Sequence, residues 1–249
     1  MTATPVTWPS ARWLIVADGD IKLIFPFSGD IRCTIGDAGR LHGTSRMIVS
    51  GMRTLPGYLE FSASLGAVGV IVRPEAAYRL LGVPQHEIAN RTLDADEVLG
   101  RAMRPWQDRL MDGSKAQERV DRMQAALRDW LKGRDRRDQV LEYAVRRLRR
   151  HEGRVRIEEL ARETGWSRRQ LECRFQNHVG VGPKSMASIF RFHAVYKQLR
   201  YRAGRPLGDL ILGHYYDQSH FLKDFRRYTE STPRTYGSAS DYGKFYIPS

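Results

Sequence analysis

The stretch Ile157-Glu-Glu-Leu-Ala-Arg-Glu-Thr-Gly-Trp-Ser-Arg-Arg-Gln-Leu-Glu-Cys-Arg-Phe175 decides the fold of the second half of this chain. Ala161, Gly165 and Leu171 stand at the offsets of a helix-turn-helix. In that motif a small residue lets two helices approach, a glycine takes the left-handed turn and a leucine closes the core. Ser167 is suited to cap the second helix. The first turn of that helix is the part that such motifs present to base edges.

The same pattern returns 50 residues further along the chain. Ser167 corresponds to Asp217, another residue that caps helices well, and Trp166 corresponds to Tyr216. The other correspondences are Ala161 with Ile211, Leu171 with Phe221, Phe175 with Phe225, and Gly182-Pro183-Lys184 with Thr232-Pro233-Arg234. Such internal similarity indicates a duplicated helix-turn-helix within one chain.

Two further helices are expected around the motifs. Residues 138–150 form one amphipathic helix, and residues 184–202 form another that joins the two motifs. At 1.5 Å per residue the joining helix spans about 28 Å, which is close to the roughly 34 Å of one turn of DNA. One helix could therefore hold two recognition helices in successive major grooves of a duplex.

Residues 134–236 resemble the DNA-binding domain of AraC/XylS-type transcriptional regulators. The resemblance is carried by Ala161–Phe175 with Gly180-Val-Gly-Pro183, and by Tyr216-Asp-Gln-Ser-His-Phe-Leu-Lys-Asp-Phe225 with Thr232-Pro233. The second stretch is the more specific, because the family's usual wording there is close to GY-x-D-Q-S-H-F-x-R-x-F. The resemblance implies a sequence-specific regulator that binds double-stranded DNA. A small-molecule effector, RNA polymerase and a second copy of the chain are further partners that it leaves open.

The chain departs from the family in the second motif. Ile211 and Tyr215 stand where the family usually has Ala and Gly. A bulky Ile would push the two helices apart, and a Tyr in a left-handed turn is strained. Gly213 would relieve that strain if the turn were shifted toward it.

The candidate DNA contacts fall into two groups. The groove-facing residues are expected to be Arg168, Arg169, Glu172 and Cys173 on the first recognition helix, and Gln218, Ser219, His220 and Lys223 on the second. Arg169 is the best candidate for a bidentate contact to guanine. For His220, a hydrogen-bonding role within the protein is an equal alternative. The expected phosphate contacts are Arg146, Arg147, Arg150, Arg174, Arg226 and Arg227.

The charge distribution agrees with a polyanionic partner for the second half. The net charge is +13, and residues 1–113 contribute none of it, since their 12 Lys/Arg balance 12 Asp/Glu. Residues 134–236 carry 23 Lys/Arg and 12 Asp/Glu, which is most of the excess. A neutral half joined to a basic half indicates two separate functions, and the basic half is expected to bind nucleic acid.

The first half reads as β-structure. Short runs rich in Ile, Val and Phe alternate with Gly and Asp, which is typical of antiparallel strands and hairpins. The expected strands are 13–17, 21–27, 31–35, 47–51, 58–63 and 67–73. Helices are expected over 75–81, ended by Gly82, and over 84–90.

Six short strands suggest a small sandwich or barrel. Residues 72–84 give the first half a looser similarity to the cupin-like N-terminal domain of some AraC-type regulators, which implies a sensory or dimerisation domain over residues 1–95. A filled core without any ligand is the slightly favoured alternative. Before residue 114 the only histidines are His42 and His86, so a His-rich metal centre is not expected.

A helical connector is expected over residues 96–133. Its first helix would cover 96–111 with a kink at Pro105, and its second would follow a cap at Ser114. The two helices either pack within their own chain or form the seam of a homodimer. A tail over residues 237–249 follows the DNA-binding domain.

Other function classes find little support in the sequence. Cys33 and Cys173 have no metal-ligand spacing and form no disulfide framework, and neither lies in a motif that would make it a DNA-repair nucleophile. No Ser-His-Asp order, phosphate loop or Glu-x-x-His pattern stands out, so neither an enzyme nor a cofactor is expected. With no signal peptide and no apolar run of about 20 residues, a cytoplasmic protein without membrane contact is expected. An architectural DNA-binding protein without an effector is the alternative to a regulator.

Overall fold

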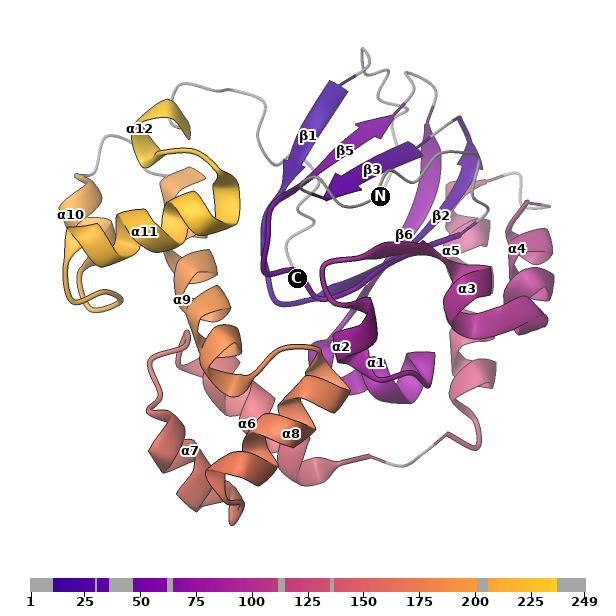
Figure 1. The fold of residues 1–249 in the computed structure, drawn as a ribbon. Helices are drawn as coiled ribbons and strands as arrows, with labels where there is room; N and C mark the ends of the chain where they lie inside the picture. The colour runs from indigo at the N-terminus through magenta and orange to yellow at the C-terminus, as the bar shows by residue number, and fades with distance from the viewer. Residues whose placement is uncertain are drawn as a thin grey trace.

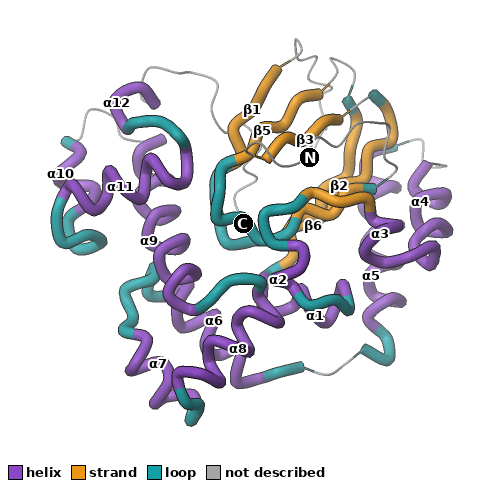
Figure 2. Tube along the Cα trace, in the orientation of Figure 1, coloured by secondary structure: helices purple, strands orange, loops and turns teal. Residues whose placement is uncertain are grey.

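The computed structural model describes residues 11–29, 31–35, 47–61, 65–111, 115–134, 137–200 and 206–236. In this part of the chain a strand-rich N-terminal region lies beside a helical C-terminal region (Figure 1). Figure 2 shows that the strands gather on one side and the helices occupy the rest. The predicted α+β fold class, with an N-terminal β-region and a C-terminal helix-turn-helix region, is confirmed. The predicted tail 237–249 lies outside the described residues.

The described strands form two antiparallel sheets. The first has the order β1-β5-β3 and the second the order β6-β2-β4-β7. Their bounds are β1 Ala11–Ile15, β2 Ile21–Ser28, β3 Ile31–Ile35, β4 Ile48–Ser50, β5 Gly57–Phe61, β6 Gly66–Val72 and β7 Thr92–Asp94. The six strands expected from the sequence are confirmed, and β7 was missed.

Alternating buried side chains show which face of the second sheet packs against the core. Along β2, Ile21, Leu23 and Phe25 are buried and the residues between them are only partly covered. This period of two places one face of the strand on the core. Ile21 pairs with Val72 of β6, which fixes the register of the central pair.

A small apolar cluster joins the two sheets. Ile31 of β3 and Leu59 of β5 pack with Ile48 of β4, and all three are buried. The cluster therefore has members from both sheets.

The connector differs from the expectation at its first helix. Instead of one helix over 96–111, the chain forms α3 (Ala95–Leu99), a 3-10 turn over Gly100–Met103, and α4 (Arg104–Met111). The break is at Gly100, with φ 64° and ψ −173°, and not at Pro105. Pro105 is instead the second residue of α4, where its missing N–H disrupts no helical hydrogen bond.

The connector helices pack within this chain. The second is α5 (Ala116–Leu131); the expected cap, Ser114, lies outside the described residues. Trp106 of α4 is buried and meets Trp130 of α5 edge-on at 5.4 Å between ring centroids. The Trp130 Nε1–H donates to the carbonyl of Leu80, at the end of α1 (Pro74–Leu81), over 2.8 Å. These contacts support packing inside the chain, and the dimer seam stays a prediction.

The C-terminal region consists of helices in the expected order. Their bounds are α6 Gln139–Arg150, α7 Ile157–Thr164, α8 Arg168–Val179, α9 Pro183–Arg200, α10 Leu207–Ile211, α11 Gln218–Thr229 and α12 Pro233–Tyr236. Helix α9 corresponds to the predicted joining helix, and α8 and α11 to the two recognition helices. Among the described residues, no helix has both the length and the apolar character to cross a membrane.

The two regions share one apolar core. The largest buried cluster runs from Ile21 and Leu81 in the first region to Phe175 and Phe190 in the second. Helix α1 and the short α2 (Gln85–Ile88) lie against α8 (Figure 1). The first region therefore packs directly on the first recognition helix.

The turn between β1 and β2 forms a second junction. Asp20 forms an ion pair with Arg149 of α6 over 2.7 Å. Gly19 lies so close to α9 that a Cβ there would come within 2.6 Å of the Phe190 ring. The buried His193 of α9 lies near Asp18 of the same turn. This turn, Asp18-Gly19-Asp20, is called the docking turn below.

Candidate nucleic-acid interface

The first motif forms as its residues dictate. Helix α7 ends at Gly165, whose φ of 69° is the left-handed conformation that glycine takes without steric cost. The Ser167 side chain then accepts the N–H of Gln170, and the Gln170 side chain accepts the N–H of Ser167, a complete capping box. Leu171 and Phe175 are fully buried, as predicted for core residues. The first turn of α8 is thereby fixed with its outer face in solvent.

All four candidate residues of α8 are exposed, and three of them, Arg168, Glu172 and Cys173, contact other side chains. Arg168 lies 3.3 Å from Glu158 of α7. Glu172 accepts a hydrogen bond from Gln176 over 3.3 Å, and its carboxylate lies against Gly182, just before α9. The Glu172 carboxylate is therefore turned toward the start of α9, where its negative charge suits the positive end of the helix dipole.

The other two candidates on α8 differ in character. The Cys173 thiol is free and exposed, and it accepts a long contact of 3.7 Å from the Asn177 amide. Arg169 is exposed in the first turn, and in the described part of the chain its guanidinium has no ion-pair partner. Of the two arginines predicted to face the groove from α8, Arg169 is therefore the one without an ion-pair partner among the described residues.

The second motif is built around a shifted turn. Gly213 has φ 79°, whereas Tyr215 does not take a left-handed conformation. Ile211 and Tyr215 are both buried. The turn therefore moves to Gly213, which is how the sequence would relieve the strain that Tyr215 implied.

Helix α11 starts as the repeat predicts. The Asp217 side chain accepts the N–H of His220 over 2.7 Å, in the same way that Ser167 caps α8. Phe221 and Phe225 are fully buried. The four candidate contacts Gln218, Ser219, His220 and Lys223 are all exposed. The structure thus places all eight candidate groove-facing residues at the surface, four on each recognition helix.

His220 has a contact inside the protein as well as an exposed position. Its ring meets the Tyr215 ring edge-on, with the ring centroids 5.3 Å apart. Both interpretations of His220 remain open, although the observed contact is one of ring packing.

Two of the six expected phosphate contacts already hold the domain together. Arg147 of α6 donates to Glu163 of α7 over 3.1 and 3.2 Å, and the Tyr143 hydroxyl donates to the same carboxylate over 2.9 Å. These bonds lower the pKa of Glu163, with the Arg147 bond as the larger cause. Arg174 donates to Asp138 over 2.6 Å and lies above the Trp166 ring.

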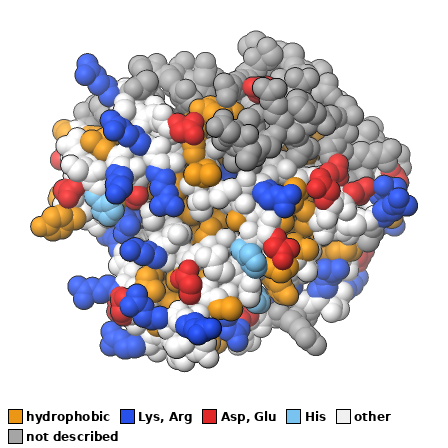
Figure 3. Space-filling view, viewed as in Figure 1, with side chains coloured by type: hydrophobic (Ala, Val, Ile, Leu, Met, Phe, Trp, Pro, Cys, Tyr) orange, Lys and Arg blue, Asp and Glu red, His pale blue; other side chains and the backbone are white. Residues whose placement is uncertain are grey.

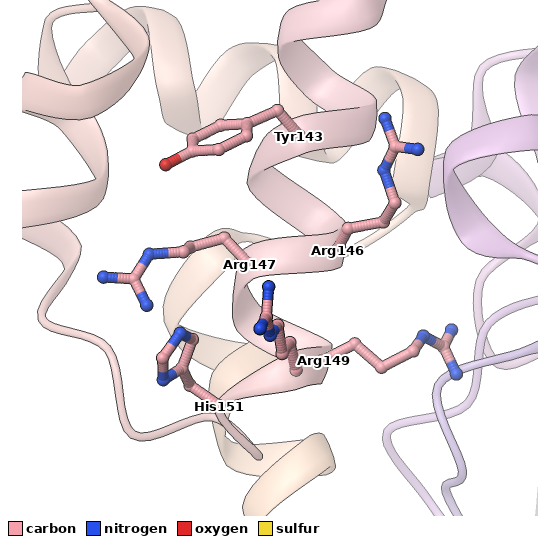
Figure 4. Close-up of a pocket in the computed structure, with 6 residues that line it drawn as sticks. Tyr143, Arg146, Arg147, Arg149 and His151 are labelled. Atoms are coloured by element: carbon pink, nitrogen blue, oxygen red, sulfur yellow. The ribbon is translucent and has the colours of Figure 1, made fainter.

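The remaining four expected phosphate contacts are exposed, although Arg146 also forms an ion pair with Glu142 of the same helix over 3.5 Å. Arg146 and Arg150 of α6, and Arg226 and Arg227 of α11, are exposed. Along α6 the surface has a hollow of about 670 Å³, and Figure 4 shows the arginine side chains spreading around it. Its lining residues are Tyr143, Arg146, Arg147, Arg149, Arg150 and His151. A hollow with this lining attracts anions.

The cations gather on one part of the surface. On the face shown in Figure 3, Lys and Arg side chains collect over the half occupied by α7, α8, α10 and α11. Acidic side chains are scattered over both halves of this face. This distribution agrees with the charge asymmetry of the sequence.

Two exposed apolar residues were missed by sequence reasoning. Tyr216 is 98% exposed and Leu212 is 79% exposed, both in the turn of the second motif. The repeat pairs Tyr216 with Trp166, but in the structure Trp166 is partly covered by Arg174, whereas Tyr216 is not. The shifted turn at Gly213 is the difference between the two motifs that accompanies this exposure.

Comparison with known families assigns the C-terminal part. Residues 160–239 match the family described as a helix-turn-helix domain. The C-terminal part of this chain is an AraC/XylS-type helix-turn-helix domain. Residues 4–94 match a family described as a domain of unknown function. No curated protein sequence matches the chain.

The whole chain resembles solved structures of ToxT from Vibrio cholerae. One from strain O395 has 12% identity and a TM-score of 0.50, and covers 92% of this chain and 93% of ToxT. A structure at 1.65 Å has 13% identity and a TM-score of 0.50, with 92% and 94% covered. A third, bound to (E)-4-(8-methylnaphthalen-1-yl)but-3-enoic acid, has 11% identity and a TM-score of 0.50, with 92% and 94% covered. At these identities the likeness concerns the fold alone.

Proposed function

We propose that this protein is a sequence-specific transcription regulator that inserts α8 and α11 into successive major grooves of duplex DNA. The observation that carries the proposal is the repeated first turn: Ser167 and Asp217 cap two helices alike, and each helix then exposes polar side chains. Helix α9 joins them, and its 18 residues span about 27 Å, near the helical repeat of DNA.

Arginines away from the groove-facing positions support the same proposal. Arg146 and Arg150 on α6, and Arg226 and Arg227 on α11, offer exposed cations for phosphates. Phosphate contacts position a protein on DNA, while mixed polar side chains choose the sequence. The matched helix-turn-helix family is one of transcription regulators and not of enzymes.

The test is selection from a pool of duplex DNA with a random central region of about 30 base pairs. Two short elements about 10 base pairs apart, centre to centre, are the expected result. Binding should also weaken steeply with salt. Salt-dependent binding without any enriched sequence would favour the alternative, an architectural DNA-binding protein. Enrichment of one element alone would contradict the two-groove proposal.

An effector acting through the N-terminal region is a second part of the proposal. It is supported by the packing of α1 and α2 on α8, since a change in the first region would reach a recognition helix directly. The ring of Tyr78 lies 4.4 Å from that of His178 at this junction. One compound to try is the naphthalenyl butenoic acid bound by ToxT. An effector should change the footprint on a selected duplex, whereas an unchanged footprint would count against this compound as an effector.

RNA polymerase and a second copy of the chain stay as proposed partners. Sedimentation of the full chain with and without a selected duplex tests the homodimer. A monomer that protects both DNA elements would contradict the homodimer. Residence in the cytoplasm belongs to the same proposal, because a regulator must reach the chromosome.

A further inference from the structure

A buried chain of hydrogen bonds connects α9 to α11. The Tyr228 hydroxyl donates to the Ser188 hydroxyl over 3.0 Å, and Ser188 donates to the Asp224 carboxylate over 3.0 Å. The Tyr215 hydroxyl donates to the same carboxylate oxygen over 3.2 Å. Asp224 is 7% exposed and Tyr215 is 8% exposed. These four residues are called the α9–α11 network below.

Burying the Asp224 carboxylate costs folding free energy, so the network calls for an explanation beyond the filling of space. A buried carboxylate without enough partners costs several kcal/mol, and an apolar side chain of similar size would often be as stable. Here Asp224 receives two hydroxyl donors, and the Arg191 guanidinium lies 5.3 Å from the Tyr215 ring centroid. Hydrogen bonds impose direction, which apolar packing does not. The network therefore restrains the orientation of α11 against α9.

The same network reaches the reading surface. The Tyr215 ring meets His220 edge-on at 5.3 Å and Phe221 at 5.2 Å. His220 is exposed on the first turn of α11, and Lys223 is exposed next to Asp224. A shift of the Tyr215 hydroxyl would therefore move a ring that touches a candidate base contact.

The first motif is anchored differently at the corresponding positions. The residue 50 positions before Asp224 is Arg174, which lies on the outside of α8 and pairs with Asp138. The position that corresponds to Tyr215 is Gly165, which has no side chain to offer. The pair Tyr215 and Asp224 thus belongs to the second motif alone.

We propose that Tyr215 and Asp224 are positioning residues that set the base preference of the second recognition helix. They fix α11 against α9 and hold the His220 ring, so their loss alters what the second DNA element must be while the first element stays the same. The inference rests on the proposed function, because it needs DNA that is read at two elements.

The experiment uses the full chain and the random duplex pool described above. Tyr215→Phe removes one donor and keeps the ring. Tyr78→Phe is the matched control, since it removes a phenolic hydroxyl that lies outside the network. In Tyr215→Phe, discrimination between bases at the second element is expected to fall about fivefold to tenfold. Discrimination at the first element should not change, and Tyr78→Phe should match the wild type at the second element.

A comparison of two Asp224 variants distinguishes a positioning role from a purely structural one. Asp224→Asn keeps an oxygen that accepts from Tyr215 and Ser188, so it should retain more of the second-element preference than Asp224→Ala. A purely structural role would lower the melting temperature and weaken binding to all duplexes alike, without changing the ratio between bases. Ser188→Ala removes the bonds of Ser188 with Tyr228 and Asp224 but leaves the bond from Tyr215 to Asp224, so it provides a milder variant if Asp224→Ala does not fold.

The outcomes distinguish the two levels of the proposal. A wild-type chain that selects no sequence would overturn the proposed function and this inference with it. A wild-type chain that selects two elements, with Tyr215→Phe and Asp224→Ala selecting both unchanged, would overturn the positioning role alone. Equal losses at both elements would also overturn it.

Discussion

Arg169 differs from its neighbour Arg168 in what surrounds its charge. The Arg168 guanidinium lies 3.3 Å from Glu158, whereas Arg169 projects into solvent from the first turn of α8. A guanidinium that enters a major groove can donate two hydrogen bonds to guanine. Of the two adjacent arginines, Arg169 is therefore the one whose removal should be felt at a single base pair.

Arg169→Ala is expected to relax the preference at one base pair of the first element, at a cost of about 1–3 kcal/mol in binding. Arg150→Ala is the control, because an exposed arginine on α6 should affect all sequences alike and reduce the salt slope by about one. Competition between the selected duplex and single-base variants measures both effects. Unchanged affinity and unchanged preference in Arg169→Ala would show that α8 does not read DNA through this residue.

His193 is a titratable group enclosed by the two regions. Burial lowers its pKa from 6.5 to about 4, although the nearby Asp18 carboxylate opposes the shift. The cations Lys22, Arg149 and Lys197 lie close enough to lower the pKa further. The imidazole is therefore neutral in the folded protein at neutral pH.

The pH dependence follows from that lowered pKa. The unfolded chain binds a proton at His193 near pH 6.5, but the folded protein binds it only near pH 4, so acid favours unfolding. The free energy of unfolding should fall by up to about 3 kcal/mol between those pH values. In urea unfolding, His193→Gln should flatten this dependence. The pKa of Asp18 is also lowered, but from 3.8, so its effect comes at lower pH. An equal slope in the variant would contradict the assignment.

At the scale of elements, local signals predicted most of the fold. Ser167 and Asp217 each cap the helix that the sequence led us to expect after them, because a cap depends only on residues within one turn. Asp138, expected as the first residue of its helix, is the cap of α6. The short β7 was missed, since its three residues become a strand only by pairing with the distant β4. The break at Gly100 was also missed, because Pro105 offered the stronger local signal.

In the candidate site, too, local sequence signals predicted some features, and contacts between distant residues determined the others. Capping and repetition put eight candidate residues on exposed helix faces, which a sequence can indicate. The turning of Glu172 toward Gly182, and the bond between Tyr215 and Asp224, depend on neighbours brought together by the fold. No spacing rule predicts such pairs.

The turn before α11 gives a test at this scale. In Gly213→Ala, the added methyl group would meet only the end of Arg154, at 3.9 Å, so its cost is the left-handed backbone. That cost should be about 1–2 kcal/mol of unfolding free energy. Gly208→Ala lies in α10 with open space around it and no left-handed backbone, and it should stabilise by about 0.5–1 kcal/mol. Urea unfolding compares the two, and changes of the same sign would contradict the turn assignment.

At the scale of the whole molecule, the two regions share their core. The apolar cluster is continuous from the sheets through α1 to α8 and α9. The docking turn adds charge to this contact: Asp20 meets Arg149, and the Arg149 guanidinium also lies 4.7 Å from the Phe190 ring centroid. Because no exposed linker separates the described regions at this junction, we expect them to unfold together.

The ion pair between Asp20 and Arg149 measures how strongly the regions are joined. Both side chains are mostly covered, with 15% and 26% exposed, so the pair should contribute about 1 kcal/mol of coupling. A double-mutant cycle with Asp20→Asn and Arg149→Gln, followed by circular dichroism and tryptophan fluorescence in urea, gives this value. Asp96→Asn, which breaks an ion pair with Arg104 inside the first region, is the control. If the two signals separate in Asp20→Asn but coincide in Asp96→Asn, the docking turn is what makes the molecule unfold as one unit. If they separate already in the wild type, the regions are independent and the continuous core does not couple them.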